Sequence, residues 1–570
     1  MQLHGRLKGS LMNLLTKDWL PLRMKNGQTA YRPPSAIADP DVVDLALPRA
    51  DFQGAAYQWL IGLLQTAAPA HDYTNWINWF AEPPTVDELE HAFAPFAAAF
   101  ELDGEGPRFM QDIDPLEDAK PSPVSGLLID APGANGIKNN TDHFVKRGRT
   151  EAICADCSAL ALFTLQINAP SGGAGYRVGL RGGGPLTTLV LPDEAGASLW
   201  HRLWLNVTLP QRITQPGQTY AAVSVDDATI FPWMGPTRVS DKKGSEVLPD
   251  AMHPLHAYWS MPRRFRLCFE QAPCRCDLCG REVSTSVREV RAKNYGANYD
   301  GPWQHPLTPY RRDPKKPNEP PLSLKGQPGG LGYRHWSPLV LPDPEESGAL
   351  PAMVVHDFMT QKVPVTREAR DFGDDVEALI GHPRLWAFGY DMDNMKPKGW
   401  YSVEMPLVAV PADQQERLRD WVQRLTELSR QMAGMTRSQI KHAWFSRPGD
   451  TKGDLSALDK QFYEATQGEF YRALGGIQQA LVDGARHVPT PVVERWYRSL
   501  RREALRLFEI QALGGPIEEL DMKRIVRARR QLLYWLAGSG KGGKIVADFA
   551  KWGAVELRSV AETLNEEATP

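Results

Sequence analysis

The sequence has few cysteines, little net charge and no long apolar segment, and each shortage narrows the class of protein. Six cysteines among 570 residues are too few for a disulfide framework and suit a reducing cytoplasm. A formal net charge of −3 gives the whole chain no general attraction to nucleic acid, so such binding needs local patches. No apolar run reaches the roughly 20 residues of a membrane-spanning helix. We therefore expect a cytoplasmic globular protein without a membrane partner.

Recognisable catalytic motifs are also missing. Neither Gly-x-Ser-x-Gly nor His-Glu-x-x-His occurs in the sequence. The glycine-rich run at 538–543 lacks the spacing of a phosphate-binding loop and follows an expected helix instead of a strand. The Asp-Phe-Gly tripeptide at 371–373 has no accompanying kinase motifs, and the His-Asp pair at 356–357 has no companion metal ligands. The sequence predicts that the protein is not an enzyme.

Two Cys-x-x-Cys pairs stand far apart in the chain, and they are the clearest chemical signal. Cys154 and Cys157 form the first pair, Cys276 and Cys279 the second. Four thiolates complete the tetrahedral coordination of Zn2+ and leave no open position, so such a zinc would be structural. Four ordinary buried thiols are the alternative, and Cys274 could replace one member of the second pair. We expect a structural zinc whose binding is coupled to folding of the 154–280 region.

The length of the chain exceeds what one core usually covers, so more than one domain is expected. Met12 is a candidate start, and residues 12–404 are expected to form a large, irregular, mixed α+β domain that contains the zinc site. Its predicted helices lie at 55–67 and 85–100, and its clearest β-like runs lie at 187–191, 220–225 and 353–355.

Residues 405–570 have a different texture, with apolar side chains recurring at helical spacing. A threonine followed by proline at 490–491 is typical of the start of a helix. The pattern predicts an antiparallel four-helix bundle. Its main helices are expected from residue 411 onward and at 458–481, 490–513 and 518–536, with a last segment at 545–565.

A loop dense in glycine follows the first cysteine pair. Its backbone must turn sharply or allow a partner to approach closely, although a bare turn is the simpler interpretation. Arg177 and Arg181 follow within ten residues, and amides near arginines suit phosphates or base edges. The loop consists of Ser171, Gly172, Gly173, Ala174 and Gly175.

Other segments offer weaker signals for nucleic acid. The polar loop at 140–148 carries Phe144, which could stack on an unpaired base, although a buried anchor is the commoner role. Residues 384–390 and 399–405 predict two strands, and Asn394 with Met395 between them could wedge a duplex open or form a solvated turn. Two basic helical faces could follow a DNA strand or face solvent: Arg495, Arg498, Arg501, Arg502 and Arg506, and Lys523, Arg524, Arg527, Arg529 and Arg530.

Taken in order, these elements resemble the large subunit of the type I-E CRISPR Cascade complex, the CasA family. The opening at 12–23 is similar to the start of that family. The match is strongest over 154–190, where Ala-Leu-Phe, the glycine loop and Gly-Leu-Arg-Gly-Gly follow in family order. It continues through the second cysteine pair, Gly-Pro-Trp-Gln-His-Pro at 301–306, Gln-Phe-Tyr at 461–463 and Glu-Phe-Tyr-Arg at 469–472.

The resemblance implies a non-catalytic subunit that recognises the protospacer-adjacent motif (PAM) in duplex DNA. It implies that the subunit starts strand separation and R-loop formation, while guide pairing reads the sequence itself. The implied partners are crRNA, double-stranded target DNA, the backbone, handle-binding and small subunits of Cascade, and the CRISPR helicase-nuclease. A zinc-stabilised assembly subunit that reads no nucleic acid is the alternative function.

The resemblance also implies nucleic-acid contacts at named positions. The loop from Ser171 to Gly175 matches the segment that approaches the PAM from the minor groove. Phe144, in the loop that also carries Lys146, matches an aromatic near the crRNA handle and the PAM. The lysine finger of the family aligns at Asn294, and we expect the neighbouring Lys293 to take that role. The wedge that separates the strands falls at Asp393, Asn394 and Met395.

Overall fold

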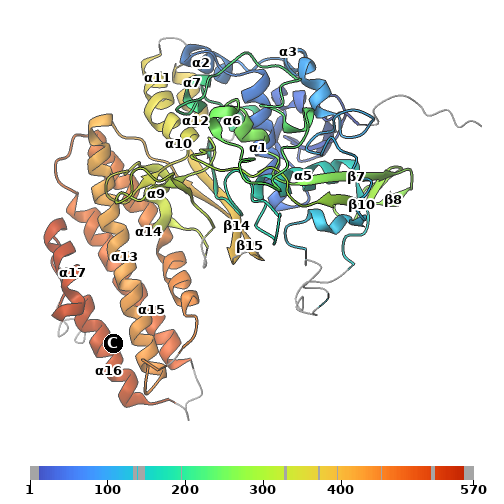
Figure 1. Ribbon diagram of the computed structural model, residues 1–570. Helices are drawn as coiled ribbons and strands as arrows, with labels where there is room; N and C mark the ends of the chain where they lie inside the picture. Colours follow the sequence, from blue (N-terminus) through green and yellow to red (C-terminus); the bar gives the residue numbers. More distant parts are fainter. Residues whose placement is uncertain are drawn as a thin grey trace, which may run out of the picture. The chain divides into compact units, whose positions relative to one another are not determined.

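The computed structural model describes residues 12–131, 138, 148–193, 196–326, 330–369, 373–393, 396–450, 452–514 and 520–557. The chain divides into two compact units, coloured along the sequence in Figure 1. The first comprises Met1–Gly326 and Pro342–Glu404, and the second comprises Gln327–Leu341 and Met405–Pro570. The first mixes helices and strands and the second is helical, so the predicted α+β class and helical C-terminal region are confirmed.

The first unit contains several small antiparallel sheets. The strand order is β2-β1-β3 in one and β15-β14-β6 in another, and β10 pairs with β4, β5 and β7 in a third. Two further sheets have the orders β12-β11-β13 and β8-β9. The strands are β1 (Leu20–Met24), β2 (Thr29–Arg32), β3 (Val42–Leu45), β4 (Ser122–Pro123), β5 (Ile153–Cys154), β6 (Thr187–Leu191), β7 (Arg264–Glu270), β8 (Cys274–Arg275), β9 (Glu282–Val283), β10 (Ser286–Lys293), β11 (Tyr310–Arg311), β12 (Leu322–Ser323), β13 (Ala349–Leu350), β14 (Arg384–Asp393) and β15 (Lys396–Pro406).

Helices surround these sheets, and α1 is buried along almost its whole length. Its buried side chains belong to the core of the unit, where Trp59 meets Phe100 edge-on with 5.7 Å between ring centroids. The helices are α1 (Ala50–Ala67), α2 (Tyr73–Ala81), α3 (Val86–Phe93), α5 (Ala155–Asn168), α6 (Leu199–Trp204), α7 (Pro210–Ile213), α8 (His256–Trp259), α10 (Met353–Asp357), α11 (Val363–Glu368) and α12 (Gly373–Ile380), with a π-helix at Phe358–Lys362 and 3-10 helices at Pro34–Ala38, Ala94–Phe100, Val124–Leu127, Pro232–Met234 and Pro249–Ala251.

Several local predictions for this unit are confirmed and two are wrong. Strand β6 occurs where expected, α1 ends at the expected residue but begins at Ala50 instead of 55, and the helix predicted at 85–100 is α3 followed by a 3-10 turn. The β-like run at 220–225 forms no strand, and the run at 353–355 is helix α10. Val354 and Val355 are fully buried in that helix, so tertiary packing overrides their β preference.

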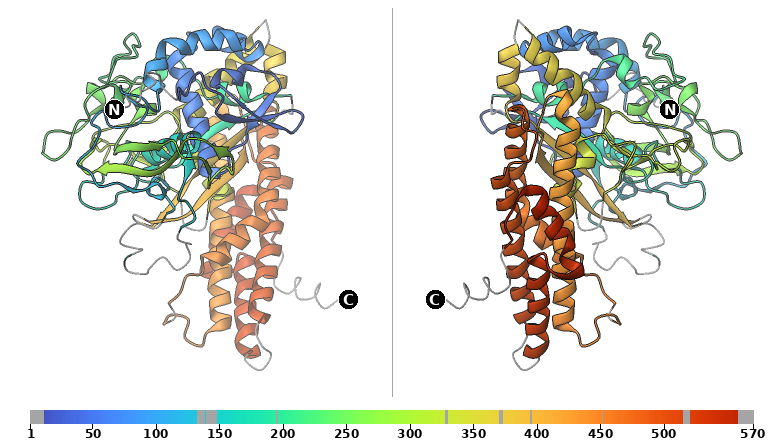
Figure 2. Two further views of the ribbon diagram at one scale, coloured as in Figure 1. Left: turned by 90° about the vertical axis from the view of Figure 1, so that its right-hand side faces the viewer. Right: turned by 90° about the vertical axis from the view of Figure 1, so that its left-hand side faces the viewer.

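The second unit is built around α13, which contacts α14, α15, α16 and α17, and both views in Figure 2 show the long helices side by side. Tyr333 stacks on Phe470 with 4.5 Å between ring centroids, which anchors the 330–341 segment within this unit. The helices are α9 (Trp336–Val340), α13 (Gln415–Trp444), α14 (Ser456–Val482), α15 (Thr490–Leu513), α16 (Met522–Leu536) and α17 (Gly540–Gly553), with 3-10 turns at Tyr333–His335 and Ala412–Gln414.

The glycine run at 538–543 serves the packing of α17 on α16. A Cβ atom on Gly542 would lie 2.5 Å from the ring of Trp535, and one on Gly543 would lie 2.8 Å from the carbonyl oxygen of Trp535. Only glycine allows this approach, which explains the run without a phosphate ligand. Nowhere in the described ranges does a helix combine the length and the apolar character that crossing a bilayer requires.

Candidate metal centre and nucleic-acid interface

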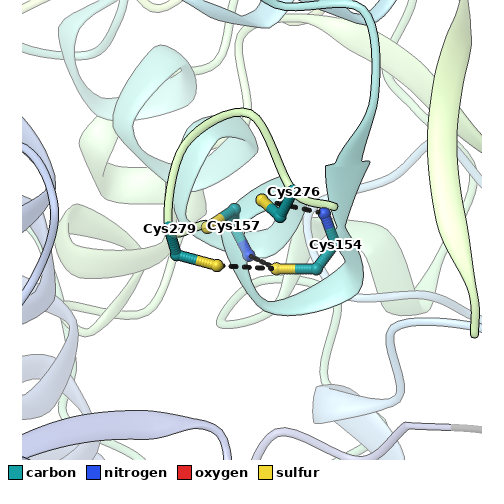
Figure 3. Close-up of side chains that lie close together, drawn as sticks. All are labelled: Cys154, Cys157, Cys276 and Cys279. Carbon is teal, nitrogen blue, oxygen red and sulfur yellow. Dashed lines mark hydrogen bonds between the residues drawn. The ribbon is translucent and has the colours of Figure 1, made fainter. Parts of the chain in front are cut away.

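The four cysteines of the two Cys-x-x-Cys pairs converge on one point, as Figure 3 shows. Their sulfur atoms all lie within 4.8 Å of one another, and those of Cys154 and Cys279 are 3.8 Å apart. Four thiolates at about 2.3 Å from a tetrahedral zinc ion would be separated by about 3.8 Å. Cys274 pairs with Val283 between β8 and β9, outside this group. The geometry therefore fits a tetrahedral metal ion on the predicted set of ligands.

Local structure presents each pair of thiols on a tight turn. Cys154 is the N-cap of α5, and its sulfur accepts a hydrogen bond from the amide of Cys157 at 3.4 Å. The second pair lies in the turn between β8 and β9, where Gly280 adopts the left-handed φ of +74° that favours glycine. Asp277 in that turn accepts hydrogen bonds from the amides of Glu151 and Ala152 at 2.7 and 2.8 Å. The two turns are thereby joined directly.

The electrostatics of the group favour a cation. Hydrogen bonds from Cys154 and Cys157 lower the pKa of the Cys276 thiol to about 6, whereas the hydrogen bond with Cys154 raises the pKa of Cys157. Thiols packed this closely cannot all ionise without a cation among them. Arg281 supplies a cation beside the group: it lies 3.8 Å from the sulfur of Cys154, pairs with Asp156 and stacks on Tyr31.

Helix α5 and strand β10 both lead from the cysteine group to the glycine loop. At one end, Ser286 of β10 pairs with Cys154, which caps α5. From there α5 extends for 14 residues, or about 21 Å, and β10 for 8 residues, or about 26 Å. The glycine loop follows the end of α5, and Asn294 follows the end of β10. A metal at the first end would therefore hold the starts of both elements together.

At the far end, the structure brings the glycine loop and the Asn294 segment into contact. The amide side chain of Asn294 donates to the carbonyl of Ala174 at 2.9 Å, and the backbone amide of Tyr295 donates to that of Gly175 at 2.8 Å. A Cβ atom on Gly175 would lie 2.8 Å from the Cβ of Asn294, so this contact requires glycine. Two segments about 120 residues apart thus form one surface.

The front of the loop is open. Ser171, Gly172, Gly173 and Ala174 are all exposed, and Gly173 has a φ of +111°. A Cβ atom added to Gly173 would have no neighbour within 4 Å. The carbonyls of Gly173 and Ala174 already accept hydrogen bonds from the amide of Tyr176 and the side chain of Asn294, so the exposed side of the loop is the part available to a ligand.

The two arginines that follow the loop form hydrogen bonds within the protein. Arg181 is 4% exposed and donates hydrogen bonds to Gln58, Thr187 and Thr308, so the prediction that it faces phosphates is wrong. Burial lowers its pKa to about 10. Arg177 donates to the hydroxyl and the carbonyl of Ser240, both at 2.7 Å.

Lys293 lies on the other side of the strand end. Its ammonium group is 2.6 Å from Asp118 and 3.8 Å from Asp114, and the hydrogen bond from Lys293 lowers the pKa of Asp118. Asn294 contacts the glycine loop, whereas Lys293 contacts an acidic loop. The two candidates for the finger therefore have different surroundings.

The remaining predicted residues lie at the edge of, or outside, the described chain. Phe144, Lys146, Asn394 and Met395 fall outside it, and Asp393 ends β14. The expected strands around this tip are confirmed as β14 and β15, which extend to Asp393 and from Lys396.

The strand that leads to that tip is anchored close to it, at Tyr390. Tyr390 donates a hydrogen bond to the buried carboxylate of Asp51 at the start of α1, and Arg49 pairs with the same carboxylate. Sequence patterns contain no signal for this anchor, because it joins residues more than 300 positions apart.

Basic residues on α15 and α16 are partly neutralised within the second unit. Arg498 pairs with Glu494, Arg506 with Glu503, and Arg529 with Glu509. Arg495, Arg502, Lys523, Arg527 and Arg530 are exposed. The helical faces therefore keep cations at the surface, at lower density than the sequence alone suggests.

Comparison with known proteins decides the family. Residues 13–507 match the family described as CRISPR-associated protein Cse1 (CRISPR_cse1). The chain belongs to the Cse1 family. The resemblance to the large subunit of the type I-E Cascade is thereby confirmed.

Solved structures of low sequence identity share the fold of this Cse1 chain. CasA of Thermus thermophilus is 18% identical, with a TM-score of 0.64 over 94% of this chain and 99% of its own. Cse1 of Thermobifida fusca is 15% identical, with a TM-score of 0.65 over 95% and 98%. A chain from a CRISPR RNA-guided surveillance complex is 13% identical, with a TM-score of 0.58 over 91% and 99%.

Proposed function

We propose that this protein is the PAM-reading large subunit of a crRNA-guided Cascade complex. In this role it binds the PAM in duplex DNA, starts strand separation and docks the helicase-nuclease, without catalysing a reaction itself. Its partners are crRNA, double-stranded target DNA, the other Cascade subunits and the helicase-nuclease. Membership of the Cse1 family supports the place in Cascade.

One structural observation carries the reading role: the exposed glycine loop is held in place by Asn294 and Tyr295 at the ends of α5 and β10. A bare backbone with small side chains can enter a minor groove, where the base pattern is degenerate. Such a reader would accept several related motifs, and guide pairing would supply the remaining specificity.

Asn294 belongs to this surface, and we propose that it supports the loop while Lys293 contributes charge. The amide of Asn294 already holds the carbonyl of Ala174, so its direct effect is on loop shape. Lys293 would have to leave Asp118 before it reaches a phosphate. Asp393, Asn394 and Met395 remain the proposed wedge, and Phe144 with Lys146 the proposed contacts near the crRNA handle. The helices of the second unit are proposed to form an antiparallel bundle that contacts the displaced strand.

We also propose that the metal is a structural zinc ion held by Cys154, Cys157, Cys276 and Cys279. The donor set is all sulfur, and the ion would supply cross-linking of the two turns and no chemistry. The sulfur spacing and the buried position of three of the four cysteines support this assignment.

The test is binding of target duplexes by the reconstituted crRNA complex, with and without this chain, over a library of flanking trinucleotides. We expect flank-selective binding only when the chain is present. Equal binding in both cases would leave an assembly subunit that reads no nucleic acid.

Substitutions at Gly173 connect that result to the loop. Gly173→Asp is expected to abolish flank-selective binding, because a carboxylate would face the phosphates. Gly173→Ala is the matched control, since it shares the unfavourable φ of +111° without the charge and should lose less binding. Undiminished binding by Gly173→Asp would remove the loop from the interface.

A further inference from the structure

Two exposed aromatic side chains stand beside the glycine loop. Tyr176 is 41% exposed and Tyr295 is 40% exposed. Among the described residues of the first unit, no other Phe, Tyr or Trp is exposed to this degree. They come from segments about 120 residues apart, and both rings pack on the same loop. Such a concentration of exposed aromatic surface marks a contact site.

Each ring covers one glycine of the loop. A Cβ atom on Gly172 would lie 3.2 Å from the ring of Tyr176, and one on Gly175 would lie 3.1 Å from the ring of Tyr295. Gly173, between them in sequence, has no such neighbour. The loop therefore presents an open backbone segment flanked by two phenol rings.

Both rings are held in position before any ligand arrives. The guanidinium of Arg263 lies 4.7 Å from the ring centroid of Tyr176, and this arginine also donates to the carbonyls of Pro170 and Arg177. Tyr295 has a left-handed φ of +63°, a conformation that a bulky residue keeps only when its surroundings enforce it. Its amide donates to Gly175, and its carbonyl accepts from the amide of Ser240 at 3.0 Å.

The hydroxyl groups of both tyrosines carry no hydrogen bond to any described residue, so each can donate to a ligand. Tyrosine is among the side chains that bind the phosphate and sugar groups of DNA, and these contacts fix register without reading sequence. A ring with two rotatable bonds also loses little entropy on binding.

We infer that Tyr176 and Tyr295 contact the sugar-phosphate backbone of duplex DNA on the two sides of the groove that the glycine loop enters. This inference rests on the proposed function of the loop and adds two residues to the same surface. The tyrosines set affinity and position, while the backbone of the loop faces the bases.

The test uses the full chain in the reconstituted crRNA complex, with duplexes carrying the flanking library. Tyr176→Phe with Tyr295→Phe removes only the hydroxyls and is expected to weaken binding about tenfold, because two hydrogen bonds to phosphates are lost. Tyr176→Ala with Tyr295→Asn also removes the rings and should weaken binding further. Asparagine tolerates the left-handed conformation, so this variant preserves the backbone at 295. All flanking sequences should lose affinity alike.

Tyr220→Phe is the control, since this tyrosine of the first unit packs on His253 and its hydroxyl is buried without a hydrogen-bond partner among the described residues. It should bind as the wild type does. A footprinting measurement on the wild type avoids any effect of substitution on folding: target duplex should protect Tyr176 and Tyr295 from hydroxyl-radical oxidation.

The outcomes separate the inference from the function on which it rests. A wild-type complex that selects no flanking sequence would overturn both. A selective wild type, with tyrosine variants that bind equally tightly and rings that stay unprotected, would overturn only the tyrosine assignment. Losses that differ strongly among flanking sequences would also overturn it, because they would indicate contacts to bases.

Discussion

The cysteine group and the glycine loop lie at the two ends of α5 and β10. They differ in exposure: the cysteine group is largely buried, and the loop is exposed to solvent. At the first end, the sulfurs of Cys154 and Cys276 accept hydrogen bonds from backbone amides, and both residues are buried. At the second end, the loop from Ser171 to Ala174 is exposed and Gly173 has open space beside it. One end is closed around its own ligands, and the other is open to a partner.

The strained backbone therefore lies at the glycine loop, and the group expected to stabilise the region lies at the other end, at the cysteines. Gly173, Gly175 and Tyr295 all have positive φ angles, and Tyr295 is the costly one because it has a side chain. Strained backbone persists only where the surrounding structure enforces it. The cysteine group lies where the two elements that carry the loop begin, so a metal ion bound there would contribute to that enforcement. Disturbing each end in turn tests this dependence.

The largest effect is expected from loss of the metal. Cys276→Ser should lose most of the bound zinc. The first unit of this variant should no longer unfold in one cooperative thermal transition, because structural zinc sites supply about 10 kcal/mol or more in small domains. Metal content by mass spectrometry and calorimetry measure the two effects. DNA binding should fall as well, although no residue of the loop is changed.

Two other thiols provide controls for that experiment. Cys268 in β7 and Cys274 in β8 lie outside the group, so Cys268→Ser and Cys274→Ser should retain the zinc. Full metal content in Cys276→Ser, or loss of zinc from Cys274→Ser, would contradict the assigned ligand set.

The second effect is at the open end. Gly175→Ala should weaken DNA binding by more than tenfold, because the new Cβ would lie 2.8 Å from Asn294 and the φ of +77° costs about 1 kcal/mol or more. The zinc content should stay complete. Gly244→Ala is the matched control, since Gly244 has a similar φ of +81° but no neighbour within 4 Å. Equal binding by both variants would mean that the contact with Asn294 is dispensable.

A third, smaller effect concerns the surroundings of the metal. Arg281→Met removes the cation beside Cys154 and should weaken zinc binding about tenfold, as other outer-sphere substitutions do. Competition with a chromogenic chelator measures this affinity. Arg275→Met is the control, because Arg275 ends β8 beside the same turn and its side chain donates to the carbonyl of Gly280. Similar zinc affinities for the two variants would contradict a role for Arg281.

The cysteine group could be predicted from the sequence because its chemistry is carried by residue type and spacing alone. Two thiols separated by two residues fit one tight turn, and two such turns suffice for four ligands. Strand β6 and helix α3 could also be predicted, because their signals lie in neighbouring residues. The threonine that caps α3 is one such local signal.

Contacts between distant segments could not be predicted in this way. Arg181 next to glycines looked like a phosphate ligand, yet it is buried against Gln58, a partner 123 positions away. The left-handed conformation of Tyr295 and the pairing of Lys293 with Asp118 likewise depend on segments that meet only in the fold. The valines of α10 show the same limit for secondary structure, since burial outweighs their local preference.

The smallest expected effect concerns the charge of Lys293. Asp118→Asn removes the nearer of the two carboxylates beside the ammonium group, so Lys293 becomes more available to a phosphate. We expect DNA binding about twofold tighter at low salt, with the slope of log affinity against log salt steeper by about one. Lys293→Met in the same background should remove that gain.

A matched pair elsewhere in the first unit controls for net charge. Lys316 and Glu319 are 3.0 Å apart and both exposed, so Glu319→Gln also frees one lysine. It should leave the salt slope unchanged if only Lys293 reaches the DNA. Equal slopes for wild type, Asp118→Asn and Lys293→Met would exclude Lys293 from the interface. Asn294 would then be the remaining candidate at the position of the finger, acting through its hydrogen bond to the loop.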